Sequence, residues 1–233
     1  MKRPAATLLV LAAIAGAVLF WLSGNIDGLI KDAIISYGSP MTQAKVSVGA
    51  VKIAPADGRG AISDLVVGNP AGFKTSHALK VARIDVEVDV ASVPKDVIVV
   101  RRIAIQAPDV IYEKGDAMTN FDAIQKNIAS YLGPSEGKKD GKKLIVEELT
   151  IRDAKAQASA AVLAGKSVSV PLPDITLKNL GKAKGGITPG ELGQEVASAL
   201  KAKLTGAVSF DRLMKSTGEV LESAGSKVKG LFK

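Results

Sequence analysis

The side chains that could do chemistry in this chain are few and far apart. His77 is the only histidine, and it follows the turn residues Pro70 and Gly72. The 233 residues include no cysteine, which excludes disulfides, thiolate metal sites and cysteine nucleophiles. A metal at His77 would need carboxylate ligands from distant parts of the chain. We therefore predict that His77 is neither a metal ligand nor a catalytic base.

Three acids, Asp85, Glu87 and Asp89, recur at every second position. Neighbouring carboxylates can act as general acid and base, or can collect a hard cation. Here they alternate with apolar residues, which is typical of a strand with one buried face and one face in water. We interpret the acids as the water side. The apolar residues form the candidate site, either as a lipid-facing surface or as core: Ile84, Val86, Val88 and Val90.

No glycine-rich phosphate-binding motif stands between a strand and a helix. The formal net charge of +8 is scattered among acids, without a basic patch interleaved with aromatic residues, so nucleic-acid binding is not expected. Only 4% of the residues are aromatic, so the core must consist of aliphatic residues, which favours strands. The sequence predicts no enzyme activity, no cofactor and no metal.

The N-terminus has the pattern of a membrane anchor. Lys2 and Arg3 precede an uncharged run, Pro4 to Gly24, long enough to span a bilayer. A cleaved signal is the alternative, but its apolar part is usually shorter and ends in small residues. The basic pair would stay in the cytoplasm, so the chain from Asn25 onward would be translocated. The predicted anchor residues are Leu8, Leu9, Leu11, Ile14, Val18, Phe20 and Trp21.

Apolar periodicity predicts two helices and a group of strands in the first part of the chain. A helix is expected from Ile26 to Tyr37, ended by Gly38-Ser39-Pro40, and another from Asn120, which would be its N-cap. A change of phase at Gly49-Ala50 indicates a bulge or kink. The expected strands cover 44–53, 61–67, 84–90, 97–105 and 110–112.

The second part repeats this pattern and ends in a helix. A polar loop is expected at 134–143, followed by strands at 144–151, 154–161, 167–172 and 175–177, then a glycine-rich linker at 181–186. Thr188, Pro189 and Glu191 form a predicted capping box. The amphipathic segment that follows carries too many charges to be a second span. We expect it to dock on the open side of the sheet; the alternatives are that it binds a partner or lies on a membrane.

The stretch from Gly60 to Gly115 and the helix start after it resemble the N-terminal region of the AsmA-like family. Together with the anchor, the resemblance covers about the first 130 residues. The resemblance depends on the order and spacing of several sequence features more than on any single motif. The matching features are the Asn69-Pro70…Gly72-Phe73 turn, the alternating strand to Val90, the Asp96-Val97-Ile98-Val99 strand start, the Ala107-Pro108…Tyr112-Glu113 step and the Asn120-Phe121 helix start.

The resemblance implies a single-pass protein of the inner (cytoplasmic) membrane with most of its chain in the periplasm. It implies a bent antiparallel sheet with an apolar concave groove, and a role in lipid transport or cell-envelope biogenesis. About eight strands at about 4.8 Å spacing make a sheet of roughly 40 Å, too short to bridge a periplasm alone. A lipid-binding module with phospholipid as partner is expected. The alternative is an envelope scaffold that binds another protein and carries no lipid.

The expected fold class is α+β, mainly β, with a single N-terminal transmembrane helix. Three segments follow from the patterns: an anchor at 1–24, a β-rich domain at 25–187, and a C-terminal amphipathic helix at 188–233.

Overall fold

The structure is a computed structural model, and it describes residues 26–133, 141–160 and 167–209. The predicted anchor lies outside these residues, as do much of the predicted polar loop and residues 210–233 of the predicted C-terminal segment. Among the described residues, no helix combines the length and apolar character needed to cross a bilayer.

The described part is α+β and mainly β, as predicted. Its elements are α2 (Ile26–Thr42), β1 (Val46–Ser47), β2 (Ala50–Ala54), η1 (Pro55–Asp57), β3 (Arg59–Val67), β4 (Leu79–Val88), η2 (Val90–Ser92), β5 (Val97–Gln106), β6 (Asp109–Lys114), α3 (Asn120–Leu132), β7 (Lys143–Arg152), β8 (Lys155–Ala160), β9 (Ser167–Val170), β10 (Ile175–Leu180), η4 (Lys182–Lys184) and α4 (Pro189–Ala207).

The strands form one bent sheet. β4 pairs with β3 on one side, and on the other with β5 in one half and β6 in the other half. β5 and β6 are therefore two halves of one long strand, interrupted at Ala107, whose φ is 44°. β7 and β8 repeat this arrangement alongside them, interrupted at Asp153 with φ 53°. The two interruptions are neighbours, since Ala107 N donates to Arg152 O at 2.8 Å, so the sheet bends along one line.

The sheet is mixed, not antiparallel throughout, which corrects the sequence-based expectation. β5 runs parallel to β7 and β6 parallel to β8, whereas the other pairs are antiparallel. Parallel neighbours need a long crossover connection. The segment between β6 and β7 contains α3 and is long enough to make it. The alternation of polar and apolar residues within a strand does not show whether the neighbouring strand runs parallel or antiparallel to it.

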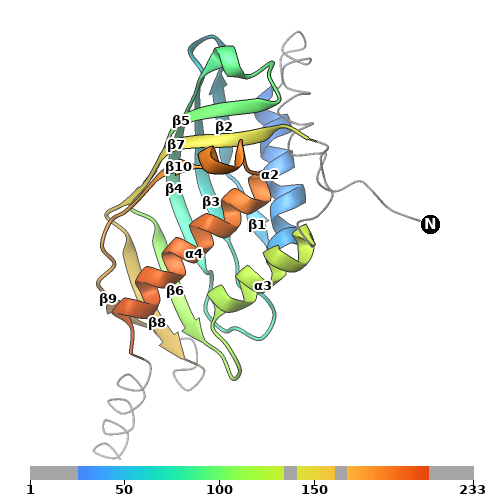
Figure 1. Ribbon diagram of the computed structural model, residues 1–233. Coiled ribbons are helices and arrows are strands. Elements are labelled where there is room, and N and C mark those ends of the chain that lie inside the picture. Colours follow the sequence, from blue (N-terminus) through green and yellow to red (C-terminus); the bar gives the residue numbers. More distant parts are fainter. Residues whose placement is uncertain (1–25, 134–140, 161–166, 210–233) are drawn as a thin grey trace, which may run out of the picture.

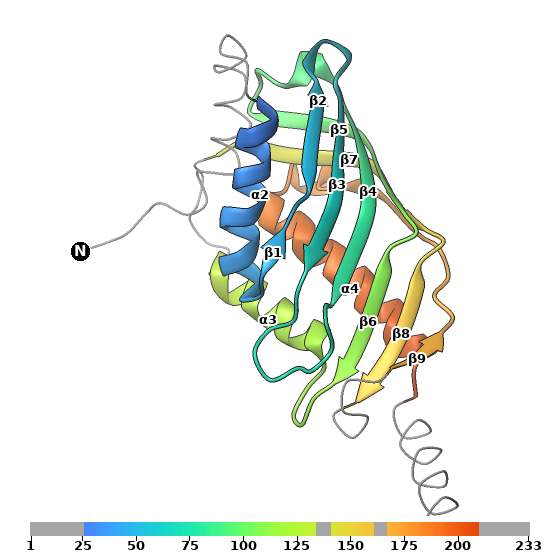
Figure 2. The ribbon, with the colours of Figure 1, turned by 180° about the vertical axis from the view of Figure 1, so that it is seen from behind.

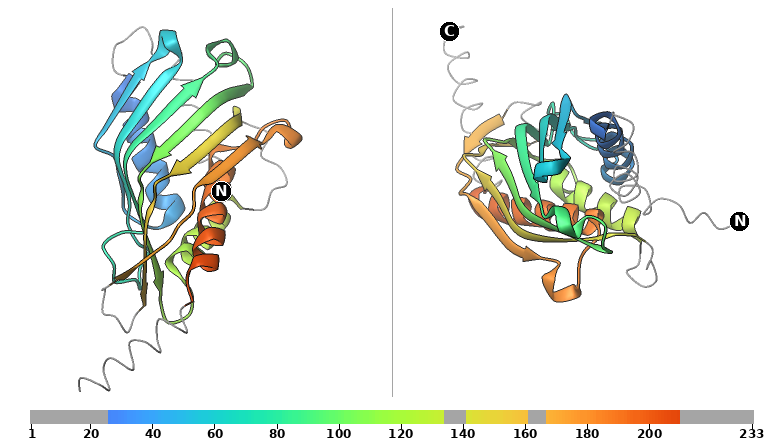
Figure 3. Two further views of the ribbon diagram at one scale, coloured as in Figure 1. Left: turned by 90° about the vertical axis from the view of Figure 1, so that its left-hand side faces the viewer. Right: turned by 90° about the horizontal axis from the view of Figure 1, so that it is seen from above.

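Helices α3 and α4 lie against the same face of the sheet, with the strands behind them in Figure 1 and in front of them in Figure 2. Seen from the side, the sheet fans and curves away from α4 (Figure 3, left). One core cluster joins β4, β5, β6, β7, β8 and β10 to both helices. The helices contribute Phe121, Ile124, Ile128, Ala197, Leu200 and Leu204 to it. The predicted docking of the C-terminal helix on the sheet is confirmed for its described part.

Helix α2 packs along β1 and β2, and two of its side chains bond to backbone groups there. The Asp27 carboxylate accepts from Ile53 N at 2.9 Å, and Lys31 Nζ donates to Gly49 O at 2.8 Å. An edge strand with unpaired groups invites pairing with other chains, and α2 blocks this edge. α2 continues through Pro40 to Thr42, past the predicted end. In that last turn, Thr42 Oγ1 donates to Gly38 O at 2.7 Å.

Several further boundaries differ from the prediction; β4, for example, begins at Leu79. β4 ends at Val88, and Val90 begins the short helix η2. The N-cap of α3 is Thr119 instead of Asn120, with Asp122 completing a capping box. The capping box predicted for Thr188 and Glu191 is confirmed.

Candidate functional site: the apolar face of the sheet

Apolar side chains form rows that cross the sheet from edge to edge. Each row consists of residues that lie directly opposite one another on neighbouring strands, which places them on one face. One row contains Val51, Ile62, Ile84, Ile105, Ile151 and Ile175. The next contains Ile53, Gly60, Val86, Ile103, Leu149 and Leu177, and a third contains Val88, Val100, Val146 and Leu180.

Most of this face is closed core. Ile84 is 8% exposed, and Val146 and Leu204 of α4 are fully buried within the same cluster. Polar contacts attach α4 to its neighbours as well: Lys201 Nζ lies 2.5 Å from Asp122 Oδ1, and Gln125 Nε2 donates to Ser198 Oγ at 2.8 Å. The helices α3 and α4 therefore occupy the space that an open groove along the whole sheet would need.

One end of the face is less covered. Val86 and Val88 are only half-buried, in contrast to Ile84, although all three belong to β4 and to the same face. Val90, predicted to share this face, lies in η2 and is 45% exposed. We call the half-buried group on β2 to β5 the upper strip; it consists of Ile53, Ile62, Val86, Val88 and Ile103. Leu177 and Leu180 of β10, on the same face, are half-buried as well. Purely apolar side chains can contact hydrocarbon without leaving a polar group unpaired.

The alternating acids of β4 and its end are paired with arginines at the surface. Arg83 Nη2 lies 2.6 Å from Asp85 Oδ1, and Arg102 Nη2 lies 3.2 Å from Glu87 Oε2. Arg101 pairs with Asp89 at 3.2 Å. The acids are on the solvent side of the strand, as the alternation predicted. Within the described ranges, no three histidine or acidic side chains gather as a metal site would require.

His77 is more enclosed than its place in a polar turn indicated, with 12% of its side chain exposed. Its Nδ1 lies 2.9 Å from Ser76 Oγ, and its Nε2 lies 3.4 Å from Asp109 Oδ2 without forming a hydrogen bond. The second oxygen of Asp109 accepts from Gln157 Nε2 at 3.2 Å. The Ser76 hydroxyl, the His77 imidazole and the Asp109 carboxylate therefore lie next to one another. Ser76 and His77 are neighbours in the chain, however, so the proximity of their side chains follows from the sequence alone.

A buried polar network centred on Glu113 was missed by sequence reasoning. Glu113 is 1% exposed, and its carboxylate accepts from Lys74 N at 2.8 Å, Thr75 N at 2.9 Å and Thr75 Oγ1 at 2.6 Å. Asn69 Nδ2 donates to Thr75 O at 2.9 Å, and Asn120 Nδ2 donates to Asn69 Oδ1 at 2.9 Å. The only signal in the sequence was an acid directly after three apolar residues. These residues hold the loop 68–77 against β6 and α3.

Three of the sequence features singled out above meet in this network. They are the turn at Asn69, the step that ends at Glu113 and the helix start at Asn120. The Glu113 carboxylate accepts from Lys74 and Thr75, and the two asparagine side chains bond to each other, which indicates a role in holding the fold. The seven predicted anchor residues lie outside the described part of the chain. Comparisons with protein-family models, curated proteins and solved structures found no match to this chain.

Proposed function

We propose that this is a membrane-anchored periplasmic protein of the AsmA-like type, which assists lipid handling in the cell envelope. The upper strip would contact an acyl chain of a membrane phospholipid. The observation that carries the proposal is the half-buried state of this strip, in contrast to Ile84, Ile151 and Val146 on the same face.

The position of the strip supports the proposal. Ile53, one member, has its backbone N–H bonded to Asp27 in the first turn of α2. In the sequence, only residues 23–25 separate α2 from the apolar run that ends at Leu22. Three extended residues span at most about 11 Å. If the run is an anchor, the first turn of α2 and the strip beside it lie near the bilayer surface.

The coverage by α3 and α4 limits what the strip can do. A continuous trough would require α4 to leave the sheet and expose the buried Ile151 and Val146, which is costly. The proposed role is therefore local contact with one acyl chain, not a conduit across the envelope.

A photo-activatable phospholipid tests this role in the full-length chain reconstituted in vesicles. Val88→Gln should lower labelling of the protein several-fold, because it places a polar amide on the strip. Val168→Gln is the matched control, since Val168 of β9 is exposed and far from the strip, and it should label like the wild type. Circular dichroism checks that each variant is folded, and Ile62→Gln replaces Val88→Gln if the latter is not.

The second candidate function is an envelope scaffold that carries no lipid. It is favoured by one observation, the closure of most of the apolar face by α3 and α4. Labelling at background level in the wild type, or equal labelling of Val88→Gln and Val168→Gln, would reject the lipid role and leave this candidate.

A further inference from the structure

Five segments meet at the end of the domain where α2 begins. Asp27 of α2 bonds to β2, and Gly58 after η1 packs against Val90 of η2. Lys142 Nζ donates to Val93 O at 2.5 Å and to Lys95 O at 3.0 Å, which joins the start of β7 to the turn after η2. Gly186 beyond η4 packs against the side chain of Lys143. We call this end the rim and define it as residues 26–30, 52–59, 89–96, 142–143 and 181–187; Figure 3 (right) looks down on it.

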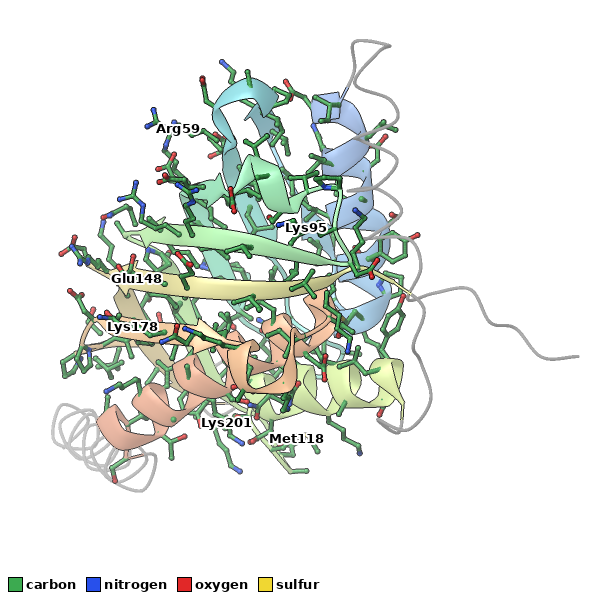
Figure 4. All side chains as sticks on the ribbon, turned by 45° about the horizontal axis from the view of Figure 1, so that its top comes forward. Arg59, Lys95, Met118, Glu148, Lys178 and Lys201 are labelled. Atoms are coloured by element: carbon green, nitrogen blue, oxygen red, sulfur yellow. The ribbon has the colours of Figure 1, made fainter. Side chains whose placement is uncertain are left out.

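The rim is basic. It carries four acids, Asp27, Asp57, Asp89 and Asp96, and seven basic residues, which leaves +3. Of the residues described at the opposite end, the loop 68–77 and residues 114–119 carry two lysines and one acid, which leaves +1 with His77 neutral. In Figure 4, Arg59 and Lys95 belong to the end turned forward, and Met118 lies at the opposite end. The basic residues of the rim are Lys52, Arg59, Lys95, Lys142, Lys143, Lys182 and Lys184.

The rim also exposes apolar side chains. Val90 of η2 is 45% exposed, and Leu29 in the first turns of α2 is 38% exposed. Basic groups around exposed apolar side chains suit an interface with anionic lipid, where the charges meet headgroups and the apolar side chains enter the interfacial region. A nucleic-acid partner would instead call for stacked aromatic residues among the basic ones, and the rim segments contain no aromatic residue.

We infer that the rim docks on the anionic bilayer surface next to the anchor, which orients the domain with its upper strip toward the membrane. The inference rests on the anchor in the proposed function, because only residues 23–25 lie between the apolar run and α2, which keeps Ile26 within about 14 Å of Leu22. The basic charge of the rim complements anionic lipid headgroups, and the short connection to the anchor keeps the rim near them. Both observations identify the lipid surface as the partner that the rim binds.

The absence of cysteine allows a direct test with single labelling sites in the full-length chain. Ala183→Cys in η4 and Ala117→Cys at the opposite end are both exposed, and both leave every charge in place. Each variant is labelled with a fluorophore and reconstituted in nanodiscs whose lipid headgroups carry a quencher. In discs with phosphatidylglycerol, the Ala183→Cys label should be quenched several-fold more than the Ala117→Cys label. Added salt or phosphatidylcholine alone should reduce this difference.

Charge reversal provides a second test of the rim contact. Lys182→Glu with Lys184→Glu should lower the quenching near η4 several-fold, whereas Lys74→Glu with Lys126→Glu, an equal change of charge outside the rim, should not. Equal quenching at both label sites, or equal effects of the two charge variants, overturns the rim contact while the anchor stands. A chain that does not stay with the disc overturns the anchor and the rim together.

Discussion

At the scale of single residues, Glu113 is a buried polar side chain held in place by its neighbours. It accepts three hydrogen bonds from the loop 68–77 while almost fully buried. A buried carboxylate is tolerated only when such donors replace water. The loop in turn places Ala78 and the start of β4 against the core.

We expect Glu113→Ala to lower the free energy of unfolding by at least about 3 kcal/mol, because several buried donors lose their acceptor. Urea unfolding of the detergent-solubilised chain measures this. Asp116→Ala is the control, since Asp116 is exposed two residues after β6, and it should change stability by less than about 0.5 kcal/mol. Equal midpoints for the two variants would contradict the importance of the network.

The two faces of β4 should respond differently to substitution. Val86→Asp places an unpaired charge among apolar residues of the upper strip and should cost on the order of 3 kcal/mol, or abolish lipid labelling if the chain still folds. Glu87→Gln removes only a surface pair with Arg102, and should change stability by less than about 0.5 kcal/mol. A large loss of function in a folded Glu87→Gln variant would instead indicate an acid-dependent site.

At the scale of elements, Asp122 connects α3 to α4. It completes the capping box of α3 and contacts Lys201 of α4. Burial on its own raises the pKa of Asp122, but hydrogen bonds from Lys201 and Thr119 and the charge of Lys201 outweigh burial, so this pKa lies below its ordinary value. The carboxylate therefore contributes stability at neutral pH.

Acidification should weaken this connection. Because the pKa is lower in the folded chain, the contribution is fully present above the unfolded value of about 3.9 and is lost as the pH falls through the folded value. The melting temperature of the wild type should thus fall as the pH is lowered from 5 to below the folded pKa of Asp122. The melting temperature of Asp122→Asn should fall less over the same range, because this variant has no group to titrate at this position. Parallel pH profiles would show that Asp122 has no stabilising role.

The packing of α4 on the sheet also permits a test within one turn of helix. Leu204 is fully buried, so Leu204→Ala should cost about 2–5 kcal/mol, while Lys203→Ala at the neighbouring exposed position should cost almost nothing. Removal of residues 188–233 should expose the core and cause aggregation. A truncated chain that remains monomeric and equally stable would show that α4 is dispensable for the fold.

At the scale of the whole molecule, the proposed anchor decides where the domain acts. The full-length chain should remain in the membrane fraction after alkaline extraction, and protease added to spheroplasts should digest the domain. N-terminal sequencing of the mature protein supplies the decisive control. A soluble protein that begins near Asn25 would contradict both the anchor and the proposed function.

Much of the secondary structure was predictable from local patterns. The alternation through Val88, the capping box at Thr188 and the helix from residue 120 depend on residues within a few positions of one another, so periodicity and capping chemistry reveal them. The N-cap of α3 was misassigned because Thr119 and Asn120 are both good caps. A distant partner, Asn69, engages the side chain of Asn120.

Only the tertiary structure decided how the apolar face is used. The parallel pairing of β5 with β7, the docking of Leu200 and Leu204, and the network around Glu113 join residues that lie far apart in the chain. Alternation marks a face as apolar but does not say whether water, lipid or a helix meets it. That depends on the path of the chain after the strand, which here returns α3 and α4 over most of the face and leaves Val86 and Val88 half-buried.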